Sequence, residues 1–201
     1  PRVVIVNNFP KLDDILFHDD PFSHREAVAC YAGGLSLIRG EKVMCEASKE
    51  MVGQLILAGK KTLDGSEAAF KNVRYVGSLN RNGINELYGS SIVGLVVLMP
   101  TGNYINSQPI KMYEYMAAGL LFVCSNFDMW REVVNKTEAG ICVDPYDTHA
   151  IASAVNYFFN NREEAQQMGL KGRKAVEDVY NWGVEEAKLL DLYKVVAKGD
   201  I

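Results

Sequence analysis

The chain has 201 residues, of which 48% are hydrophobic and 23% are charged, and 21 Lys and Arg against 25 Asp and Glu give a net charge of −4. This size and balance are typical of one globular domain, and they exclude a disordered or fibrous chain. We expect no nucleic-acid partner, because a nucleic-acid-binding domain carries a basic excess. We also expect no transmembrane segment, since the longest apolar stretch, from Tyr115 to Cys124, is about half of the roughly 20 residues that a spanning helix needs.

The cysteines and histidines indicate neither a disulfide framework nor a metal site. No two of the four cysteines form a Cys-x-x-Cys pair, and each lies in an apolar setting. Free thiols in a reducing, cytoplasmic environment are therefore expected. The beginning of the chain, PRVVIVNNFP, lacks the charged start and the cleavage site of a signal peptide. The three histidines show no metal-ligand spacing, so we predict no metal.

Short β-branched runs alternate with amphipathic stretches along most of the chain. The predicted strands are 3–6, 28–32, 55–58, 73–76, 92–98, 121–124 and 139–143, and the predicted helices are 39–51, 66–70, 84–88, 109–118, 129–134, 148–159, 163–179 and 184–196. Apolar strands that alternate with helices are typical of a parallel sheet covered on both faces. Right-handed crossovers then give a doubly wound, Rossmann-like α/β fold with extra C-terminal helices.

Ligands of open α/β sheets bind at the carboxyl ends of the strands, and the loop after strand 28–32 offers suitable chemistry. Gly33 and Gly34 let the backbone approach a phosphate closely. Arg39, five residues further on, could add a charge-assisted contact. A tight turn with a solvated arginine explains these residues equally well.

A second candidate is the polar stretch 100–108, which leads into the predicted helix 109–118. The backbone N–H groups that could bind an anion at the start of this helix belong to Ser107, Gln108 and Ile110. Lys111 and Glu114 share one face of the helix, although their spacing also suits an ordinary surface ion pair. A third loop, 77–82, could contact a base. From the residues alone, the chain is a phosphate-binding α/β domain without a recognisable nucleophile or acid–base pair.

Five segments together resemble the C-terminal domain of GT-B glycosyltransferases of family 4, also called group 1. They are YAGGLSLIRGEKVMCEAS, VRYVGSLNRNGINELYGSS, PIKMYEYMAAGLLFVCSNFDMWREVV, AGICVDPYDTHAIASAV and MGLKGRKAVEDVYNWGVEEAKLLDLY. The resemblance covers about Tyr31 to Tyr193 in the family's order. It implies a retaining hexosyltransferase of polysaccharide biosynthesis, which moves a sugar from a nucleotide-diphosphate sugar to an acceptor hydroxyl with no obligatory metal or cofactor.

The resemblance also implies roles for two parts of this one structural unit, and it implies a partner domain. Residues 1–180 would hold the nucleotide-sugar donor, and the helix in residues 181–201 would pack back toward an N-terminal, acceptor-binding domain. Because 201 residues leave no room for that domain, we expect the chain alone to be inactive. A peripheral position at the inner membrane face, through the acceptor domain, stays open.

The resemblance also implies roles for individual residues at the positions that match the family's motifs. Arg39 matches the basic residue that neutralises the donor diphosphate, and Glu114 matches the second glutamate of a Glu-x7-Glu motif, which binds the ribose hydroxyls. Leu79 falls where a base contact is expected. The remaining donor contacts fall on the two loops, at Gly33, Gly34, Asn106, Ser107, Gln108, Pro109, Ile110 and Lys111.

The sequence departs from the family pattern at three positions. Asn106 replaces the first glutamate of the motif, which puts contacts to the transferred sugar in question. Gly34 stands where the family has an arginine, and we expect Lys111 to compensate as a second catalytic cation beside Arg39. Leu121 replaces a proline. Two alternatives follow: a non-catalytic nucleotide-sugar-binding or interaction module of the same fold, and a GT-B nucleotide-sugar epimerase.

Overall fold

A computed structural model describes residues 3–60 and 70–197 of the chain, and its centre is a parallel sheet. The strands are β1 (Val28–Ala32), β2 (Gln54–Ala58), β3 (Val73–Gly77), β4 (Val93–Val96), β5 (Leu121–Ser125) and β6 (Gly140–Val143). Their order is β3-β2-β1-β4-β5-β6, and every neighbouring pair is parallel. The chain thus starts in the middle of the sheet and builds outward to each edge in turn, which is the doubly wound arrangement. The predicted α/β fold is confirmed.

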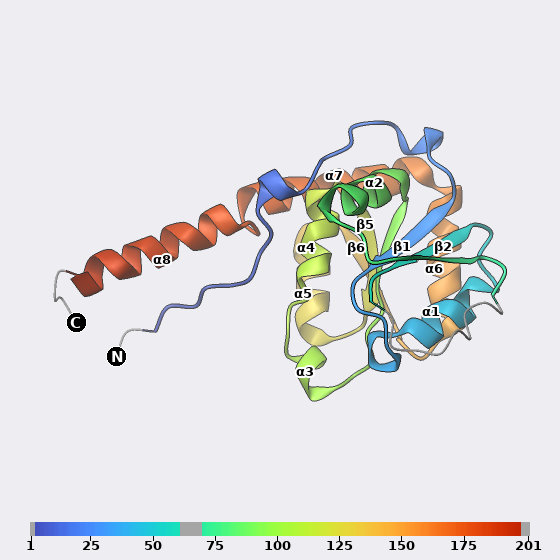
Figure 1. Cartoon of the computed structure of the whole chain (residues 1–201), viewed down its shortest axis with the longest axis horizontal. Helices are drawn as coiled ribbons and strands as arrows, with labels where there is room; N and C mark the ends of the chain where they lie inside the picture. Colours follow the sequence, from blue (N-terminus) through green and yellow to red (C-terminus); the bar gives the residue numbers. More distant parts are fainter. Residues whose placement is uncertain (1–2, 61–69, 198–201) are drawn as a thin grey trace.

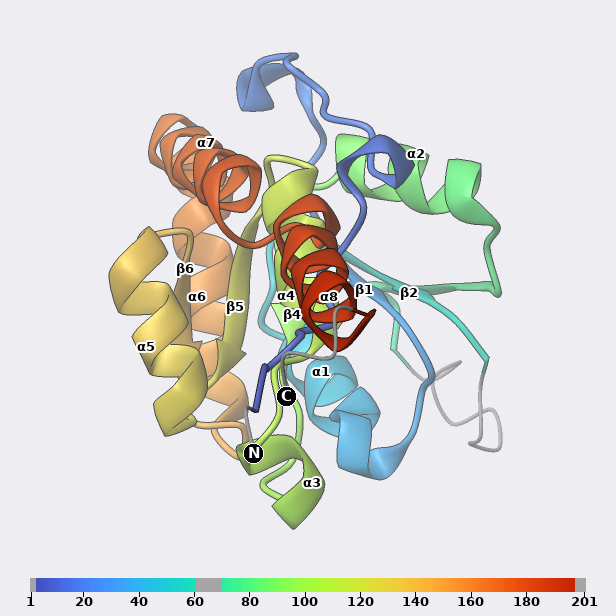
Figure 2. The same cartoon turned by 90° about the vertical axis from the view of Figure 1, so that its left-hand side faces the viewer.

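Helices cover both faces of this sheet (Figures 1 and 2). They are α1 (Glu41–Ser48), α2 (Arg81–Ser90), α3 (Gly102–Ile105), α4 (Ile110–Ala117), α5 (Asp128–Thr137), α6 (Thr148–Asn160), α7 (Arg162–Asp178) and α8 (Trp182–Ala197), with 3-10 turns η1 (Leu12–Asp14), η2 (Phe22–His24) and η3 (Leu37–Arg39). Helices α1 and α6 pack together on one face, and α4 and α7 pack together on the other. Because the central strands lie between these layers, every residue of β1, β4 and β5 is buried, as the apolar runs predicted.

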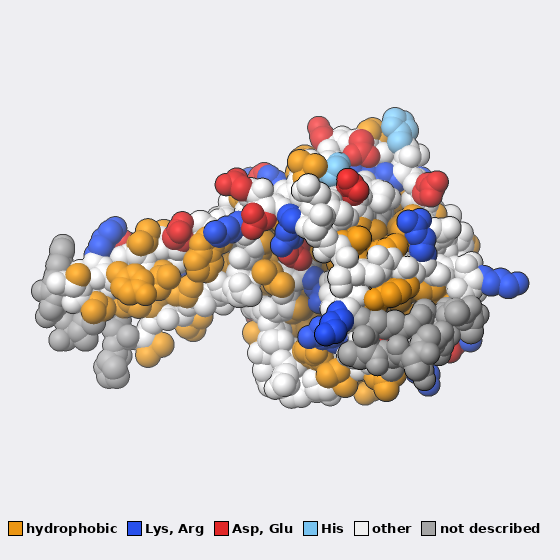
Figure 3. All heavy atoms as spheres, in the orientation of Figure 1, with side chains coloured by type: hydrophobic (Ala, Val, Ile, Leu, Met, Phe, Trp, Pro, Cys, Tyr) orange, Lys and Arg blue, Asp and Glu red, His pale blue; other side chains and the backbone are white. Residues whose placement is uncertain are grey.

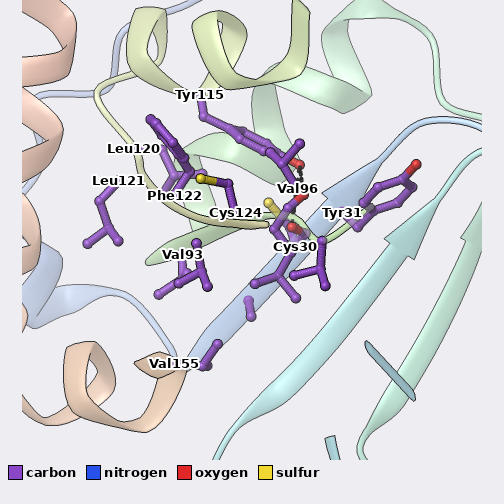
Figure 4. Packing of buried hydrophobic residues seen from close by; sticks show 14 of the residues in the cluster. Cys30, Tyr31, Val93, Val96, Tyr115, Leu120, Leu121, Phe122, Cys124 and Val155 are labelled. Carbon is purple, nitrogen blue, oxygen red and sulfur yellow. Dashed lines mark hydrogen bonds between the residues drawn. The ribbon is translucent and has the colours of Figure 1, made fainter. Parts of the chain in front are cut away.

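The core next to the site depends on Tyr115 of α4, which points inward beside Cys30 and Val96 (Figure 4). Its hydroxyl accepts a hydrogen bond from the Ala32 backbone N–H at 3.3 Å, so the ring links α4 to the end of β1. The ring lies on Gly94 of β4, where an added Cβ would be 2.5 Å from Tyr115 Cδ2. The glycine therefore makes room for the tyrosine.

Gly94→Ala is accordingly expected to lower the free energy of unfolding by about 1–3 kcal/mol, the usual cost of overpacking a core. Urea denaturation followed by circular dichroism measures it. Gly102→Ala is the matched control, because a Cβ on Gly102 meets nothing within 4 Å. Equal stability of the two variants would contradict this account of the Tyr115 contact.

The predicted strand 3–6 is wrong. Residues 3–10 run as a single extended segment beside α8, away from the sheet (Figures 1 and 2). The apolar run pairs with no strand, and both edges of the sheet, β3 and β6, lie elsewhere. The segment is held instead by Asn7, whose backbone N–H donates to Glu185 at 2.9 Å, and by the Trp182 N–H, which donates to the Pro10 carbonyl at 2.9 Å.

Helix α8 continues away from the body of the domain, and apolar side chains line its exposed surface (Figures 1 and 3). Leu190, Tyr193 and Val196 are 52%, 62% and 50% exposed. An exposed apolar patch of this kind is typical of an interaction surface. Among the described residues, no helix is both long and apolar enough to cross a membrane.

Other boundaries also differ from the prediction. The predicted helix 39–51 is divided at Gly40, which has a positive φ of 75° and would place a Cβ 1.7 Å from the Val97 carbonyl oxygen. The polar loop 100–108 contains the short helix α3, which the sequence pattern did not indicate. The predicted helix 66–70 lies almost wholly outside the described residues. The prediction of free cysteines is confirmed, including Cys124 and Cys142, whose Sγ atoms are 3.7 Å apart on neighbouring strands.

Candidate functional site

A cleft of about 350 Å³ lies where the carboxyl ends of β1, β2 and β3 meet α2 and α4. Its lining residues are Ala32, Gly33, Gly34, Ala58, Gly59, Lys60, Ser78, Leu79, Arg81, Ile84, Tyr88 and Glu114. This is the expected ligand position of a doubly wound sheet. It includes residues from two of the three candidate loops and from the start of α2.

Backbone contacts between the loops form one wall of the cleft. The Gly33 N–H donates to the Ala58 carbonyl at 2.8 Å. Gly59 has a φ of 143°, and a Cβ there would be 1.7 Å from the Gly33 carbonyl oxygen. Only glycine allows the loops after β1 and β2 to approach this closely. The backbone of Gly33, Gly34 and Gly59 thus forms one side of the cleft, here called the glycine wall, which a bulky anion can approach.

Arg39, at the end of η3, lies over Gly34. A Cβ on Gly34 would be 2.1 Å from Arg39 Nη1, so a side chain at position 34 would overlap with the guanidinium. Arg39 Nε donates to the Tyr104 hydroxyl of α3 at 3.2 Å, and this hydrogen bond is the main reason that the pKa of Arg39 is raised. The space of the arginine expected at position 34 is thus taken by Arg39 itself.

Lys111 reaches the same loop from the first turn of α4. Its Nζ lies 3.1 Å from the position that a Cβ on Gly33 would take and 5.0 Å from the centre of the Tyr31 ring. Burial lowers the pKa of Lys111 to about 8, and the nearby Arg39 lowers it further, while Glu114 opposes the shift. Two cations therefore converge on Gly33–Gly34, and an anion bound there would relieve their mutual repulsion.

Glu114 provides the carboxylate of the cleft, and two residues of α2 hold it. Its Oε1 is 3.0 Å from Arg81 Nη1, and its Oε2 accepts a hydrogen bond from the Tyr88 hydroxyl at 3.2 Å. The Glu114 side chain is 14% exposed and that of Arg81 47%. The same ion pair also borders a second cavity of about 320 Å³, on the side of the N-terminal segment and Trp182. Sequence reasoning missed Arg81 and Tyr88 as site residues, although Arg81 lies in the third candidate loop.

The loop before α4 lies at a neighbouring cavity. Asn106 and Gln108 border a space of about 290 Å³ together with residues 6–9. Ser107 is fixed to the core, because its carbonyl accepts a hydrogen bond from Trp130 Nε1 at 2.6 Å. Pro109 precedes α4 as its N-cap, and Ile110 begins the helix. Asn106 does not line the cleft that contains Glu114.

The structure thus brings part of the predicted set together. Gly33, Gly34, Leu79 and Glu114 line one cleft, and Arg39 and Lys111 meet at its glycine wall. Lys60, which follows Gly59, is a lining residue that was not predicted, and a basic residue directly after a strand-ending glycine was the available signal. Across residues 3–60 and 70–197, no three His, Cys, Asp or Glu side chains form a group that could hold a metal ion.

Solved structures support the fold assignment. The chain is similar to sucrose-phosphate synthase from Thermosynechococcus elongatus, with a TM-score of 0.80 and 19% identity over 96% of this chain and 52% of that one. It is similar to Anabaena Alr3699/HepE, solved in complex with UDP and glucose, with a TM-score of 0.74 and 14% identity over 94% and 56%. It also matches the C-terminal domain of the glycosyl transferase group 1 family protein LpcC from Francisella tularensis, with a TM-score of 0.71 and 14% identity over 85% and 98%.

Sequence comparisons point in the same direction. A phosphatidyl-myo-inositol mannosyltransferase of Mycobacterium leprae is 32% identical over 88 residues, which are 44% of this chain and 23% of that protein. The chain therefore spans about a quarter of this curated relative, and about half of the first two solved structures named above. The family model of glycosyl transferases group 1 matches residues 21–175. The chain belongs to the glycosyl transferases group 1 family, with the Rossmann-like fold of the C-terminal GT-B domain.

Proposed function

We propose that the chain binds the nucleotide-diphosphate sugar donor of a retaining glycosyltransferase. The observation that carries this proposal is the convergence of Arg39 and Lys111 on the Gly33–Gly34 backbone, beside a cleft that contains a carboxylate. Two cations against a glycine wall suit a diphosphate, and Glu114 suits the ribose. The complex of Alr3699/HepE with UDP and glucose supports this choice of ligand.

In this proposal Arg39 and Lys111 are the catalytic residues. When the bond between the sugar and the diphosphate breaks, negative charge develops on the departing phosphate. Preorganised cations that meet this charge lower the barrier. Arg39 is already oriented by Tyr104, and Lys111 is already desolvated, so neither side chain needs to reorganise. Leu79 would contact the base, Asn106 would stand at the transferred sugar, and the backbone N–H groups from Ser107 to Ile110 would approach the phosphates.

We further propose that transfer requires an acceptor-binding domain, which α8 would contact. The exposed apolar residues Leu190, Tyr193 and Val196 support this role for the helix. Residues 1–180 would then bind the donor, and residues 181–201, in the same structural unit, would pack back toward the acceptor-binding domain. Asn106, which lies outside the cleft of Glu114, favours the alternative of a binding module without activity. Sugar transfer after an acceptor domain is supplied would exclude that alternative.

Donor binding is tested by isothermal titration calorimetry with UDP-, GDP- and ADP-sugars. We expect saturable binding of at least one of them, and about tenfold weaker binding by Glu114→Gln, because a hydrogen bond to a charged group is lost. Glu132→Gln is the matched control, since that carboxylate is 72% exposed on α5. The proposal fails if none of the three donors binds to the unmodified chain.

A further inference from the structure

The carboxylate of Glu114 is held by a clamp of two side chains, Arg81 and Tyr88, which lie at the beginning and near the end of α2. Arg81 donates to one carboxylate oxygen at 3.0 Å, and Tyr88 donates to the other at 3.2 Å. Tyr88 is fully buried, and its ring packs edge-on against Tyr115 at 5.0 Å between centroids. One end of the clamp is therefore fixed in the core, and the other is at the rim of the cleft.

This clamp leaves a defined part of the carboxylate available to a ligand. An ionised carboxylate has about four acceptor positions, two on each oxygen. Arg81 and Tyr88 each use one position, on different oxygens, so one position stays open on each. Two adjacent open acceptors match two adjacent hydroxyl donors. The geometry therefore fits a cis-diol better than a single hydroxyl.

Arg81 also has an electrostatic part in this arrangement. Glu114 is largely buried, and a buried carboxylate needs a counter-charge and hydrogen bonds to keep its orientation. Arg81 supplies both, whereas Tyr88 supplies only a hydrogen bond. Without Arg81, the carboxylate could turn toward Lys111, whose charge also interacts with Glu114.

We propose that Arg81 is a positioning residue that makes Glu114 selective for the 2′,3′-cis-diol of a ribonucleotide over a 2′-deoxyribonucleotide. The proposal rests on the proposed donor-binding function. It assigns the discrimination to the Arg81–Glu114–Tyr88 clamp, and Arg81 itself need not touch the nucleotide.

The test compares the dissociation constants of UDP, GDP and ADP with those of their 2′-deoxy counterparts, measured by calorimetry. For the unmodified chain we expect the ribonucleotide to bind about tenfold more tightly than its deoxy counterpart. In Arg81→Gln this ratio is expected to fall to about twofold or less, mainly because the ribonucleotide binds more weakly. Arg81→Lys, which keeps the charge, should restore part of the ratio. Tyr88→Phe, which keeps the packed ring, should lower it as well.

Asn82→Ala is the matched control, since Asn82 is the next residue of α2 and is exposed. It should leave the ratio unchanged. An unchanged ratio in Arg81→Gln would overturn the inference. An equal loss of affinity for the ribonucleotide and its 2′-deoxy counterpart would also overturn it, because such a loss indicates general charge attraction. If none of UDP, GDP and ADP binds the unmodified chain, the proposed function itself fails. The two failures are therefore distinguishable.

Discussion

Replacing Lys111 with methionine is expected to stabilise the fold while it weakens nucleotide-diphosphate binding by about thirtyfold. Burial is the main reason that the pKa of Lys111 falls from 10.5 to about 8, and the corresponding cost of the charged form in the folded chain is about 3 kcal/mol as an upper bound. Methionine has a similar length and no charge, so the variant avoids this cost. The lost affinity corresponds to one charge-assisted contact of about 2 kcal/mol. Urea denaturation and calorimetry measure the two effects.

The pH dependence gives this prediction a definite sign. Between pH 8 and about 10.5, the unfolded chain keeps the Lys111 proton while the folded chain releases it. The free energy of unfolding of the unmodified chain should therefore gain a contribution that rises with pH across this window, and Lys111→Met should lack it. Diphosphate affinity should fall above pH 8 in the unmodified chain only. Lys136→Met, at a side chain that is 67% exposed, is the control. Lower stability of Lys111→Met than of this control would contradict the prediction.

Arg39→Ala is expected to weaken donor binding by about a hundredfold, with little change in stability. The guanidinium lies over Gly34, where it can make a bidentate contact with a phosphate, and such contacts are about twice as strong as neutral hydrogen bonds. Because the side chain is only half-buried, its removal leaves no deep cavity. Titration with the nucleotide sugar that binds the unmodified chain measures the loss.

Two further variants separate charge from geometry at this position. Arg39→Lys should retain part of the affinity, since lysine keeps the charge but loses the planar fork that also holds Tyr104. Lys42→Ala removes an exposed cation one residue into α1 and should behave like the unmodified chain. If Arg39→Ala binds as tightly as Lys42→Ala, the role of Arg39 at the diphosphate is refuted.

The fold could be predicted from the sequence because local pattern and tertiary environment agree along most of it. Strands such as 121–124 are apolar at every position, and the sheet buries them on both faces. The exception is 3–6, which has the same apolar pattern but lies beside α8 instead of in the sheet. Whether an apolar run pairs as a strand depends on how the whole sheet assembles, and a local sequence pattern cannot predict that.

The residues of the candidate site also include some that the sequence could predict and some that it could not. Gly33, Gly34 and Arg39 are close in sequence, so the loop after β1 could be identified from a short stretch. Spacing indicated only that Lys111 and Glu114 share a helical face, and the resemblance implied their roles at the donor. The contact between Arg81 and Glu114 joins residues 33 positions apart, and it depends on how α2 and α4 pack against the sheet. Neither residue's neighbours in sequence indicate the other.

The hydrogen bond from Trp130 to the Ser107 carbonyl links a buried residue of α5 to the loop before α4. Trp130 is completely buried in α5 and has no access to a ligand in the cleft, yet its indole N–H fixes the backbone of the loop that precedes α4. Phenylalanine could fill much of the same space but would release that loop. A substitution at this interior position would therefore act on the loop before α4 without any direct contact to the cleft.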